Sequence, residues 1–533
     1  MTSHENYITP GHSKAWKIGK LEQLFRRSGL FRWPLARHER AIINGGLQDN
    51  WRGNAADGSV FLGAAHADSE QSQAFHNFHW LRDLRARGGN DARTAARGLI
   101  ETWLDKNSNW HPNRWQPDIM GTRISNLLFC YGWYGESASE DFQSKLAASI
   151  ARQAHCLALD WRRLNNKDSQ ITALKGLAIA EATLGCSTDE MQALIDIAMP
   201  RIEARLFDDG GHKSRMPETH FYMLRDLIEL RSATAFAGLG EDKTLNHIIA
   251  KMGTICRMWR HGNGSFTHMN GAGIVPSELI DETLARAGSR GKVLQHAPYS
   301  GFMRFSSGRS TIIMDVGTPC NEADITGFGT LGFEFSFGSN LLIVNPGQPP
   351  VAANLHRLLC TTSAHSTLSL DGQNSSSPTD NRMASTSDVE FGQVDGGLMT
   401  KASHSGYEKS HGIIHHRTLY LATNGGNLRG ADQLEYTGAP GELPRQAIIR
   451  FHLHPKVSAA MLGNGRVLMK IRGNRIGWIF KAGQCSVSID TSIYFDAGMR
   501  QSAQQIVLTA PMTNIRSVGS QDLKWAFQRN DTV

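Results

Sequence analysis

Apolar residues recur at helical spacing through the first half of the chain. Phe75, Phe78, Leu81 and Leu84 follow one another at intervals of three residues, and polar residues lie between them. Short Gly, Asn or Asp breaks separate further segments of this kind, near 120–134, 141–161, 170–184, 188–207, 217–238 and 243–260. Roughly eight helices joined by short loops predict antiparallel helix pairs. Such pairs close into an α/α toroid or stack as a solenoid, and periodicity alone does not separate these two arrangements.

The pattern changes after Gly271, where short runs of β-branched and aromatic residues replace the helical spacing. Dipeptides typical of tight turns separate these runs, as at Asp371-Gly372 and Asn424-Gly425. The runs include Ser310–Val316, Leu331–Phe337, Leu341–Val344, Ile413–Leu421 and Ala447–His452. Many short strands with no helices between them predict an antiparallel β-sandwich.

The length of 533 residues exceeds what one hydrophobic core ordinarily holds, so two large domains are expected. We predict an α+β multidomain chain with an N-terminal α/α toroid at 41–285 and a C-terminal antiparallel β-sandwich at 286–533. Residues 1–40 are basic and aromatic, and they are expected to pack as an N-terminal arm.

Composition excludes few classes of protein. Hydrophobic residues make up 40% and charged residues 20%, which is typical of a globular chain. The net charge of +7 would suit an acidic ligand and also an ordinary basic surface. No basic run indicates nucleic acid, and no apolar run is long enough for a transmembrane segment. The oligomeric state cannot be read from these features.

Localisation and redox state follow from the chain start and the cysteines. The residues after Met1 lack the apolar core of a secretory signal, which predicts a cytoplasmic protein. A mis-called start or non-classical export would instead place the chain in the cell envelope or periplasm. Seven scattered cysteines without a CxxC pair fit reduced thiols better than a disulfide framework or a zinc site.

Several strings rich in His, Arg, Asn and Gly follow one another along the chain. They are FHWLRDLR at 78–85, WQPDIMGTRISN at 115–126, DGGHKSR at 209–215, RHGNGS at 260–265, AHSTL at 364–368 and HSGY at 404–407. In this order, over about residues 40 to 510, they resemble the heparinase II/III-like polysaccharide lyases. The resemblance implies a helical toroid followed by a β-sandwich, in agreement with the independent pattern above.

The resemblance also implies β-elimination on a uronic-acid glycan. Such a site must stabilise charge on the C6 carboxylate, place a base at the sugar C5 and protonate the leaving O4. In this family an Asn or His of the toroid, a Tyr, and a His of the sandwich perform these tasks.

His365 matches the family's sandwich histidine, because Ala-His-Ser-Thr-Leu resembles its Ala-His-Asn-Thr segment. A neutral imidazole is a competent base near physiological pH. The alternative is a strand-start histidine bonded to backbone.

Asn165 and Asn166 resemble the family's Asn-His pair at a helix start, where an amide would hold the substrate carboxylate. Their alternative role is helix N-capping.

The family's tyrosine is missing. Its Ser-Pro-x-Tyr-His pattern reads Met216-Pro217-Glu218-Thr219-His220 here, so Thr219 stands at the tyrosine position. Tyr222, His220 and His212 are candidates for the missing role, and His212 is also a candidate for contact with the substrate. Arg215 is a candidate for gripping the carboxylate bidentately, with a solvated first-turn arginine as the alternative.

Other candidates for contact with substrate are Trp115 and Arg123 on one helix, and His404 and Arg417 around one strand. Tryptophans at helical spacing are also typical of a core, and polar strand residues are typical of a solvated face.

No cofactor is expected. Gly327 and Gly329 stand where family members often carry a His-x-Asp pair, so a structural divalent metal is only an option.

The leading hypothesis is a carbon–oxygen lyase acting on an acidic glycan or oligosaccharide. The alternative is a catalytically impaired glycan-binding or envelope-assembly protein on the same scaffold. Hydrolysis by two carboxylates ranks last, because no Asp/Glu pair stands out.

Overall fold

The computed structural model describes residues 18–28, 31, 41–62, 73–319, 327–348, 353–377, 382–438, 442–496 and 499–531. Its contacts divide the chain into two compact units. The helical unit comprises Met1–Leu206, Tyr222–Ala250 and Ala285–Gly288. The sheet unit comprises Phe207–Phe221, Lys251–Leu284 and Ser289–Val533. The predicted boundaries at 40 and 285 remain predictions, and the segments 207–221 and 251–284 group with the sheets rather than with the other helices.

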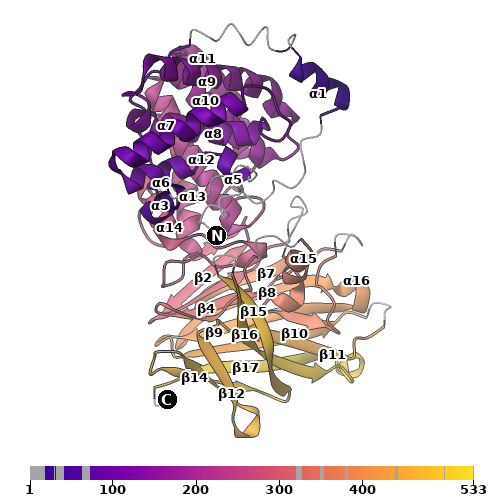
Figure 1. Ribbon diagram of the computed structural model, residues 1–533. Helices are drawn as coiled ribbons and strands as arrows, with labels where there is room; N and C mark the ends of the chain where they lie inside the picture. The colour runs from indigo at the N-terminus through magenta and orange to yellow at the C-terminus, as the bar shows by residue number, and fades with distance from the viewer. Residues whose placement is uncertain are drawn as a thin grey trace. The chain divides into compact units, whose positions relative to one another are not determined.

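Helices fill the first half of the chain and strands the second, as predicted (Figure 1). The longer helices are α3 (Ala55–Leu62), α6 (Trp80–Arg87), α7 (Gly89–Lys106), α8 (Pro117–Tyr134), α9 (Glu140–Asp160), α10 (Lys167–Leu184), α11 (Thr188–Glu203), α12 (Pro217–Phe236), α13 (Lys243–Met258) and α14 (Ser277–Ala287). Part of the predicted arm is described: it contains α1 (Lys20–Arg27), whose Arg26 pairs with Asp160 of α9 at 2.5 Å. Residues 1–17, 29–30 and 32–40 lie outside the described residues.

Local sequence sets where these helices begin and how closely they pack. Ser187 and Glu190 form a reciprocal capping box at the start of α11. Gly185 ends α10 in the left-handed conformation, with φ of 91°. Gly121 of α8 and Gly176 of α10 face each other so closely that a Cβ on Gly176 would lie 2.2 Å from the Gly121 Cα. Any larger residue at position 176 would force these two helices apart.

The sheet unit contains three sheets, and every ladder between its described strands is antiparallel. Their strand orders are β1-β2-β3-β4-β5, β12-β13-β14-β17-β10-β9-β8-β7 and β15-β16-β11-β6. The strands are β1 (His296–Ala297), β2 (Phe302–Ser307), β3 (Ser310–Asp315), β4 (Phe333–Phe337), β5 (Asn340–Ile343), β6 (Leu368–Leu370), β7 (Thr386–Val394), β8 (Gly397–Tyr407), β9 (Ile413–Ala422), β10 (Asn427–Tyr436), β11 (Gln446–His452), β12 (Val457–Met461), β13 (Val467–Ile471), β14 (Gly477–Ala482), β15 (Ser486–Asp496), β16 (Met499–Pro511) and β17 (Ser520–Asn530).

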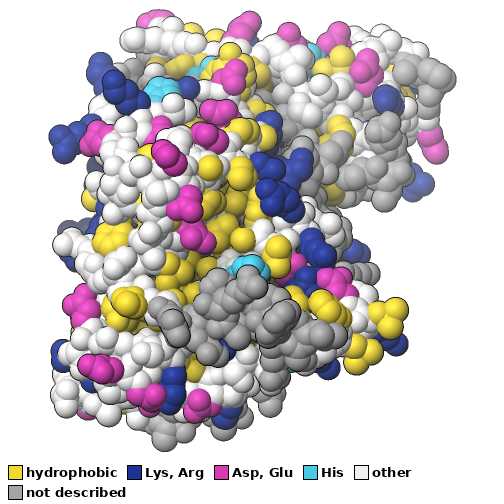
Figure 2. All heavy atoms as spheres, turned by 90° about the horizontal axis from the view of Figure 1, so that it is seen from above, with side chains coloured by type: hydrophobic (Ala, Val, Ile, Leu, Met, Phe, Trp, Pro, Cys, Tyr) yellow, Lys and Arg dark blue, Asp and Glu magenta, His cyan; other side chains and the backbone are white. Residues whose placement is uncertain are grey.

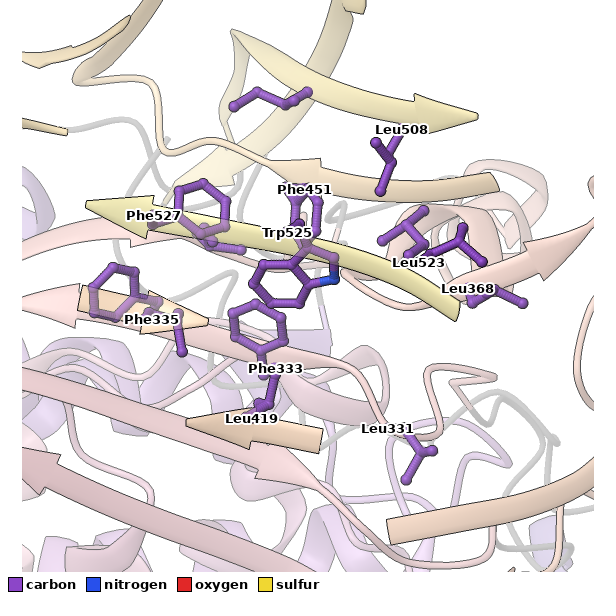
Figure 3. Close-up of a cluster of buried hydrophobic side chains, with 14 of the residues drawn as sticks. Leu331, Phe333, Phe335, Leu368, Leu419, Phe451, Leu508, Leu523, Trp525 and Phe527 are labelled. Atoms are coloured by element: carbon purple, nitrogen blue, oxygen red, sulfur yellow. The ribbon is translucent and has the colours of Figure 1, made fainter. Parts of the chain in front are cut away.

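Residues of all three sheets share one hydrophobic core. Figure 3 shows Trp525 of β17 with Phe333 of β4 and Phe451 of β11 around it. Its ring stacks on Phe333 at 5.7 Å between centroids and meets Phe451 at 4.7 Å. Alternate residues of β9 are buried, which is the pattern of a strand with one face on a core. The predicted helical and antiparallel sandwich parts are confirmed.

The surface and the helices add two observations on partners. On the face seen in Figure 2, Lys and Arg side chains are interspersed with Asp and Glu. No large area of one charge sign dominates that face. None of the helices in the described ranges is long and apolar enough to cross a membrane.

Candidate functional site

His365 lies in the sheet unit, between a 3-10 turn (Thr362–Ala364) and β6. Its Nδ1 is 2.8 Å from the Thr361 carbonyl oxygen. A carbonyl only accepts hydrogen bonds, so Nδ1 carries the ring proton and Nε2 keeps its lone pair. Among the described residues, none hydrogen-bonds to Nε2. Burial lowers the pKa of His365 despite the opposing Thr361 bond, so the ring is neutral at physiological pH. This is the protonation state that a general base requires.

Several hydrogen bonds fix the short loop that carries His365. Arg417 donates from Nη1 to the Ser366 carbonyl at 2.7 Å and to the Leu331 carbonyl at 2.8 Å. Thr367 donates from its hydroxyl to the Thr330 carbonyl at 2.8 Å. His452 contacts the Ser363 carbonyl through Nε2 at 3.0 Å. The backbone on both sides of His365 is therefore anchored to neighbouring strands and loops.

Gly329 leaves the space that the His365 ring occupies. A Cβ at Gly329 would lie 2.5 Å from Cδ2 of that ring, and one at Gly327 would lie 2.7 Å from the Asn270 Cα. The positions where related chains carry His-x-Asp are thus closed to side chains here. Within the described ranges, no group of three His, Cys, Asp or Glu residues could hold a metal ion.

Thr219 does not replace the family's tyrosine. Its side chain is buried, and its hydroxyl oxygen lies 3.9 Å from the Met216 sulfur. A threonine hydroxyl in an apolar setting neither ionises nor relays protons near neutral pH. The tyrosine's function is therefore absent from this position.

The structure gives His212 and His220 structural roles instead of the predicted catalytic and binding ones. Both side chains are fully buried. Nδ1 of His220 accepts the backbone N–H of His212 at 3.2 Å, and its Nε2 bonds the Met252 carbonyl at 2.9 Å. Nδ1 of His212 is 2.7 Å from the Ser214 hydroxyl. Burial lowers the pKa of His220 to about 3, so this ring stays neutral with both nitrogens occupied.

Arg215 does not grip a substrate carboxylate, because all five of its guanidinium N–H groups have protein partners. Nε donates to the Ser300 carbonyl at 2.8 Å, and Nη1 donates to the carbonyls of Gly317 and Thr318. Nη2 donates to the Gly301 carbonyl and to the Asp315 carboxylate. Arg215 instead attaches the 207–221 segment to the sheets.

His404 and Arg417 belong to a buried network rather than to a binding face. The Gly406 N–H donates to Nδ1 of His404, so Nε2 of that ring donates to Nδ1 of His415 at 3.1 Å. His415 then donates to Asp432 at 2.7 Å, and Arg417 donates to the same oxygen at 2.6 Å. Burial alone would raise the pKa of Asp432, but Arg417 and His415 hold it well below its usual range. The predicted substrate contacts of His404 and Arg417 are replaced by support of the His365 loop.

Asn165 and Asn166, both in the helical unit, have different surroundings. The Asn166 side chain accepts from the backbone N–H groups of Asp168 at 2.8 Å and Ser169 at 3.0 Å, which caps α10. The capping alternative therefore describes Asn166. Asn165 is exposed, and its contact with a substrate carboxylate stays a prediction.

Trp115 and Arg123 are core residues of the helical unit, not sugar-binding ones. Trp115 is 2% exposed and Arg123 is fully buried. Arg123 donates to Gln153 at 2.7 Å and to two backbone carbonyls, and its guanidinium lies 4.4 Å from the centre of the Trp103 ring. Burial lowers the pKa of Arg123 to about 9. Neither side chain is available to a polymer.

Tyr222 is half-buried and lines a small polar cavity of about 80 Å³ in the helical unit. The cavity is crossed by ion pairs: Lys175 lies 2.6 Å from Glu229 and 3.0 Å from Asp226, and Arg82 lies 3.2 Å from Glu229. It has room for several water molecules but is smaller than typical ligand pockets. A catalytic role for Tyr222 stays a prediction.

Glu218 is a further buried residue of the sheet unit, and it was not among the residues predicted from the sequence. This residue is 5% exposed, and its Oε2 accepts the Gly273 N–H at 2.8 Å. Burial raises the pKa of Glu218 to about 7. A signal was available, because Glu218 stands directly before the position of the missing tyrosine.

Comparisons with known proteins agree with this architecture. Residues 289–526 match the family described as heparinase II/III-like, C-terminal. The FtsZ-localized protein C of Caulobacter vibrioides is 28% identical over 482 residues, which cover 86% of this chain and 81% of that protein.

Solved structures show the same fold at low identity. A heparinase III structure has a TM-score of 0.68 at 13% identity, covering 96% of this chain and 91% of its own. The heparan sulfate lyase of Pedobacter heparinus has a TM-score of 0.63 at 13% identity, covering 99% and 86%. The architecture is the helical toroid and β-sandwich of these structures, as predicted. The C-terminal part of this chain, residues 289–526, is therefore similar to the heparinase II/III-like family.

Proposed function

We propose that this chain is a carbon–oxygen lyase that performs β-elimination on a uronate residue of an acidic glycan or oligosaccharide. The observation that carries the proposal is the state of His365. Its Nδ1–H donates to the Thr361 carbonyl, and no described residue hydrogen-bonds to the lone pair of its Nε2. The similarity of the scaffold to heparinases supports the choice of reaction.

In this mechanism Nε2 of His365 removes the proton from the sugar C5. The electrons of the C5–H bond form the C4–C5 double bond as the C4–O4 bond breaks, and O4 takes up a proton. Because the pKa of His365 is lowered, the ring stays neutral at pH values somewhat below the ordinary histidine pKa. Base catalysis therefore extends to mildly acidic pH. The Thr361 carbonyl stabilises the imidazolium that forms, because it accepts the Nδ1–H in both protonation states.

The test is a panel of uronate polymers and oligosaccharides, followed by the ultraviolet absorbance of the unsaturated product. We expect turnover on at least one member, and a loss of roughly 10²- to 10⁴-fold in His365→Ala. His416→Ala is the matched control, because His416 is a partly exposed histidine bonded to Ser403 and Glu435 in the same unit. Equal activity in His365→Ala and wild type would refute the role of His365.

A second candidate is a catalytically impaired glycan-binding or envelope-assembly protein. Two observations favour it: the buried Thr219 at the tyrosine position, and the closed positions at Gly327 and Gly329. The relative from Caulobacter vibrioides bears a name that states a localisation with FtsZ and no reaction. Calorimetric binding of an acidic glycan without any unsaturated product would support this candidate, whereas robust turnover would exclude it.

A further inference from the structure

We propose that Glu218 is the catalytic acid that protonates the leaving O4, in place of the tyrosine that this chain lacks. The inference rests on the proposed lyase function and names one more residue of the same site. Glu218 differs from the other buried carboxylates of the sheet unit in its hydrogen-bond partners.

Four carboxylates are buried among the described residues of the sheet unit: Glu218, Asp315, Glu334 and Asp432. Asp315 pairs with Arg215, and Asp432 pairs with Arg417 and His415. Glu334 bonds His261 at 3.0 Å and accepts two backbone N–H groups. Glu218 has one hydrogen bond, from Gly273, and no cationic partner in the described part of the chain. An unpaired buried carboxylate is costly, so the protonated form is favoured here.

The raised pKa of about 7 agrees with this geometry and has the same cause, burial, opposed only by the Gly273 bond. At neutral pH a large fraction of Glu218 therefore carries a proton. A carboxylic acid of this kind can donate to a departing alkoxide, which needs its proton as the C4–O4 bond breaks.

One short segment connects Glu218 with the surroundings of His365. Gly273 contacts Glu218 so closely that a Cβ there would lie 2.6 Å from a carboxylate oxygen. Gly271 packs on Cys360, since its Cβ would lie 3.1 Å from that sulfur. Cys360 directly precedes Thr361, the residue that holds the His365 ring. The 270–273 segment thus contacts both Glu218 and Cys360, the residue directly before Thr361.

The step is balanced. The C5 proton goes to Nε2 of His365, and the C5–H electrons form the new double bond. The C4–O4 electrons leave with O4, which takes the proton of Glu218. Afterwards His365 is protonated and Glu218 is ionised, and proton exchange with solvent restores both residues.

Glu218→Gln removes the acid and keeps the shape of the side chain. On an O4-linked substrate we expect a 10²- to 10⁴-fold loss of turnover. On a uronate with fluoride at C4 we expect a loss of less than about tenfold, because fluoride leaves without a proton. A general structural defect would lower both rates alike. Glu278→Gln, an exposed glutamate in the first turn of α14, is the matched control.

The pH dependence of turnover and of stability tests the protonation state of Glu218 separately. The wild-type kcat/KM is expected to fall above about pH 7 as Glu218 loses its proton, and Glu218→Gln should lack this alkaline limb. In urea unfolding, the advantage of the variant over wild type should grow as pH rises from 5 to 8, because only wild type must bury a charge. If that advantage stays constant with pH, Glu218 ionises normally and the proposal is overturned, whatever the turnover.

Failure of the lyase function and failure of the Glu218 role give different results. A wild type with no turnover on any uronate defeats the lyase function and this role together. An active wild type whose Glu218→Gln variant keeps both its rate and its alkaline limb defeats only the role of Glu218. Equal losses on the O4-linked and the fluoride substrates also defeat it.

Discussion

At the scale of single residues, polar groups in this protein divide by whether their hydrogen-bonding capacity is already used. Arg215 and His220 have partners for every donor or acceptor of their side chains. His365 and Glu218 each keep one group without a hydrogen-bond partner among the described residues. Free capacity in a buried position is costly to stability, and it is what a reacting group requires.

Arg215 is predicted to matter for stability and not for chemistry. Arg215→Ala leaves Asp315 buried without its cation, which should cost roughly 3–5 kcal/mol of unfolding free energy. Arg215→Lys keeps the charge but loses the planar fork of donors, so an intermediate loss is expected. Urea unfolding measures both. A stable Arg215→Ala protein with a raised KM for a uronate would restore the carboxylate-binding role.

At the scale of elements, the start of α10 separates capping from substrate binding. Asn166→Ala should lower stability by about 1 kcal/mol, because it removes the acceptor for the Asp168 and Ser169 N–H groups. Asn166→Asp keeps an acceptor and should retain both stability and turnover. A strong loss of turnover in Asn166→Asp with unchanged thermal unfolding would show that the amide contacts the substrate.

The loop between β3 and β4 contains a sharper test of the His365 geometry. In Gly329→Ala the new methyl would collide with the His365 ring at 2.5 Å, so the ring must rotate or its loop must shift. We expect turnover to fall at least tenfold, with a shifted His365 imidazole signal in NMR. Gly372→Ala is the control for an added methyl, since nothing lies within 4 Å there, although its positive φ of 75° adds some strain. An unchanged rate in Gly329→Ala would mean that the position of this ring is not critical.

At the scale of the whole molecule, the succession of helices and strands was predictable from the sequence. Helical spacing and turn dipeptides are local signals, and they located α8 to α13 and most strands of the sheet unit. The site was predictable only in part. The resemblance identified His365, but it also selected Arg215, Arg417 and His404. These residue types can bind substrates, but in this fold their side chains hydrogen-bond to other parts of the protein.

The grouping of 207–221 with the sheets was not predictable, because it depends on the contacts of Arg215 with residues about 100 positions away. Glu218 was missed for a related reason. Its distinguishing property is the lack of a cation nearby, and a sequence does not show which charges the fold brings together.

The role of His365 in β-elimination is tested most directly by the ultraviolet absorbance of unsaturated product, recorded for wild type and His365→Ala on the same panel of acidic glycans. If His365 is the base of a lyase, absorbance increases progressively with wild type on at least one uronate substrate, and the rate is lower by two or more orders of magnitude in the variant. No increase on any substrate, or equal increases for both proteins, would contradict it.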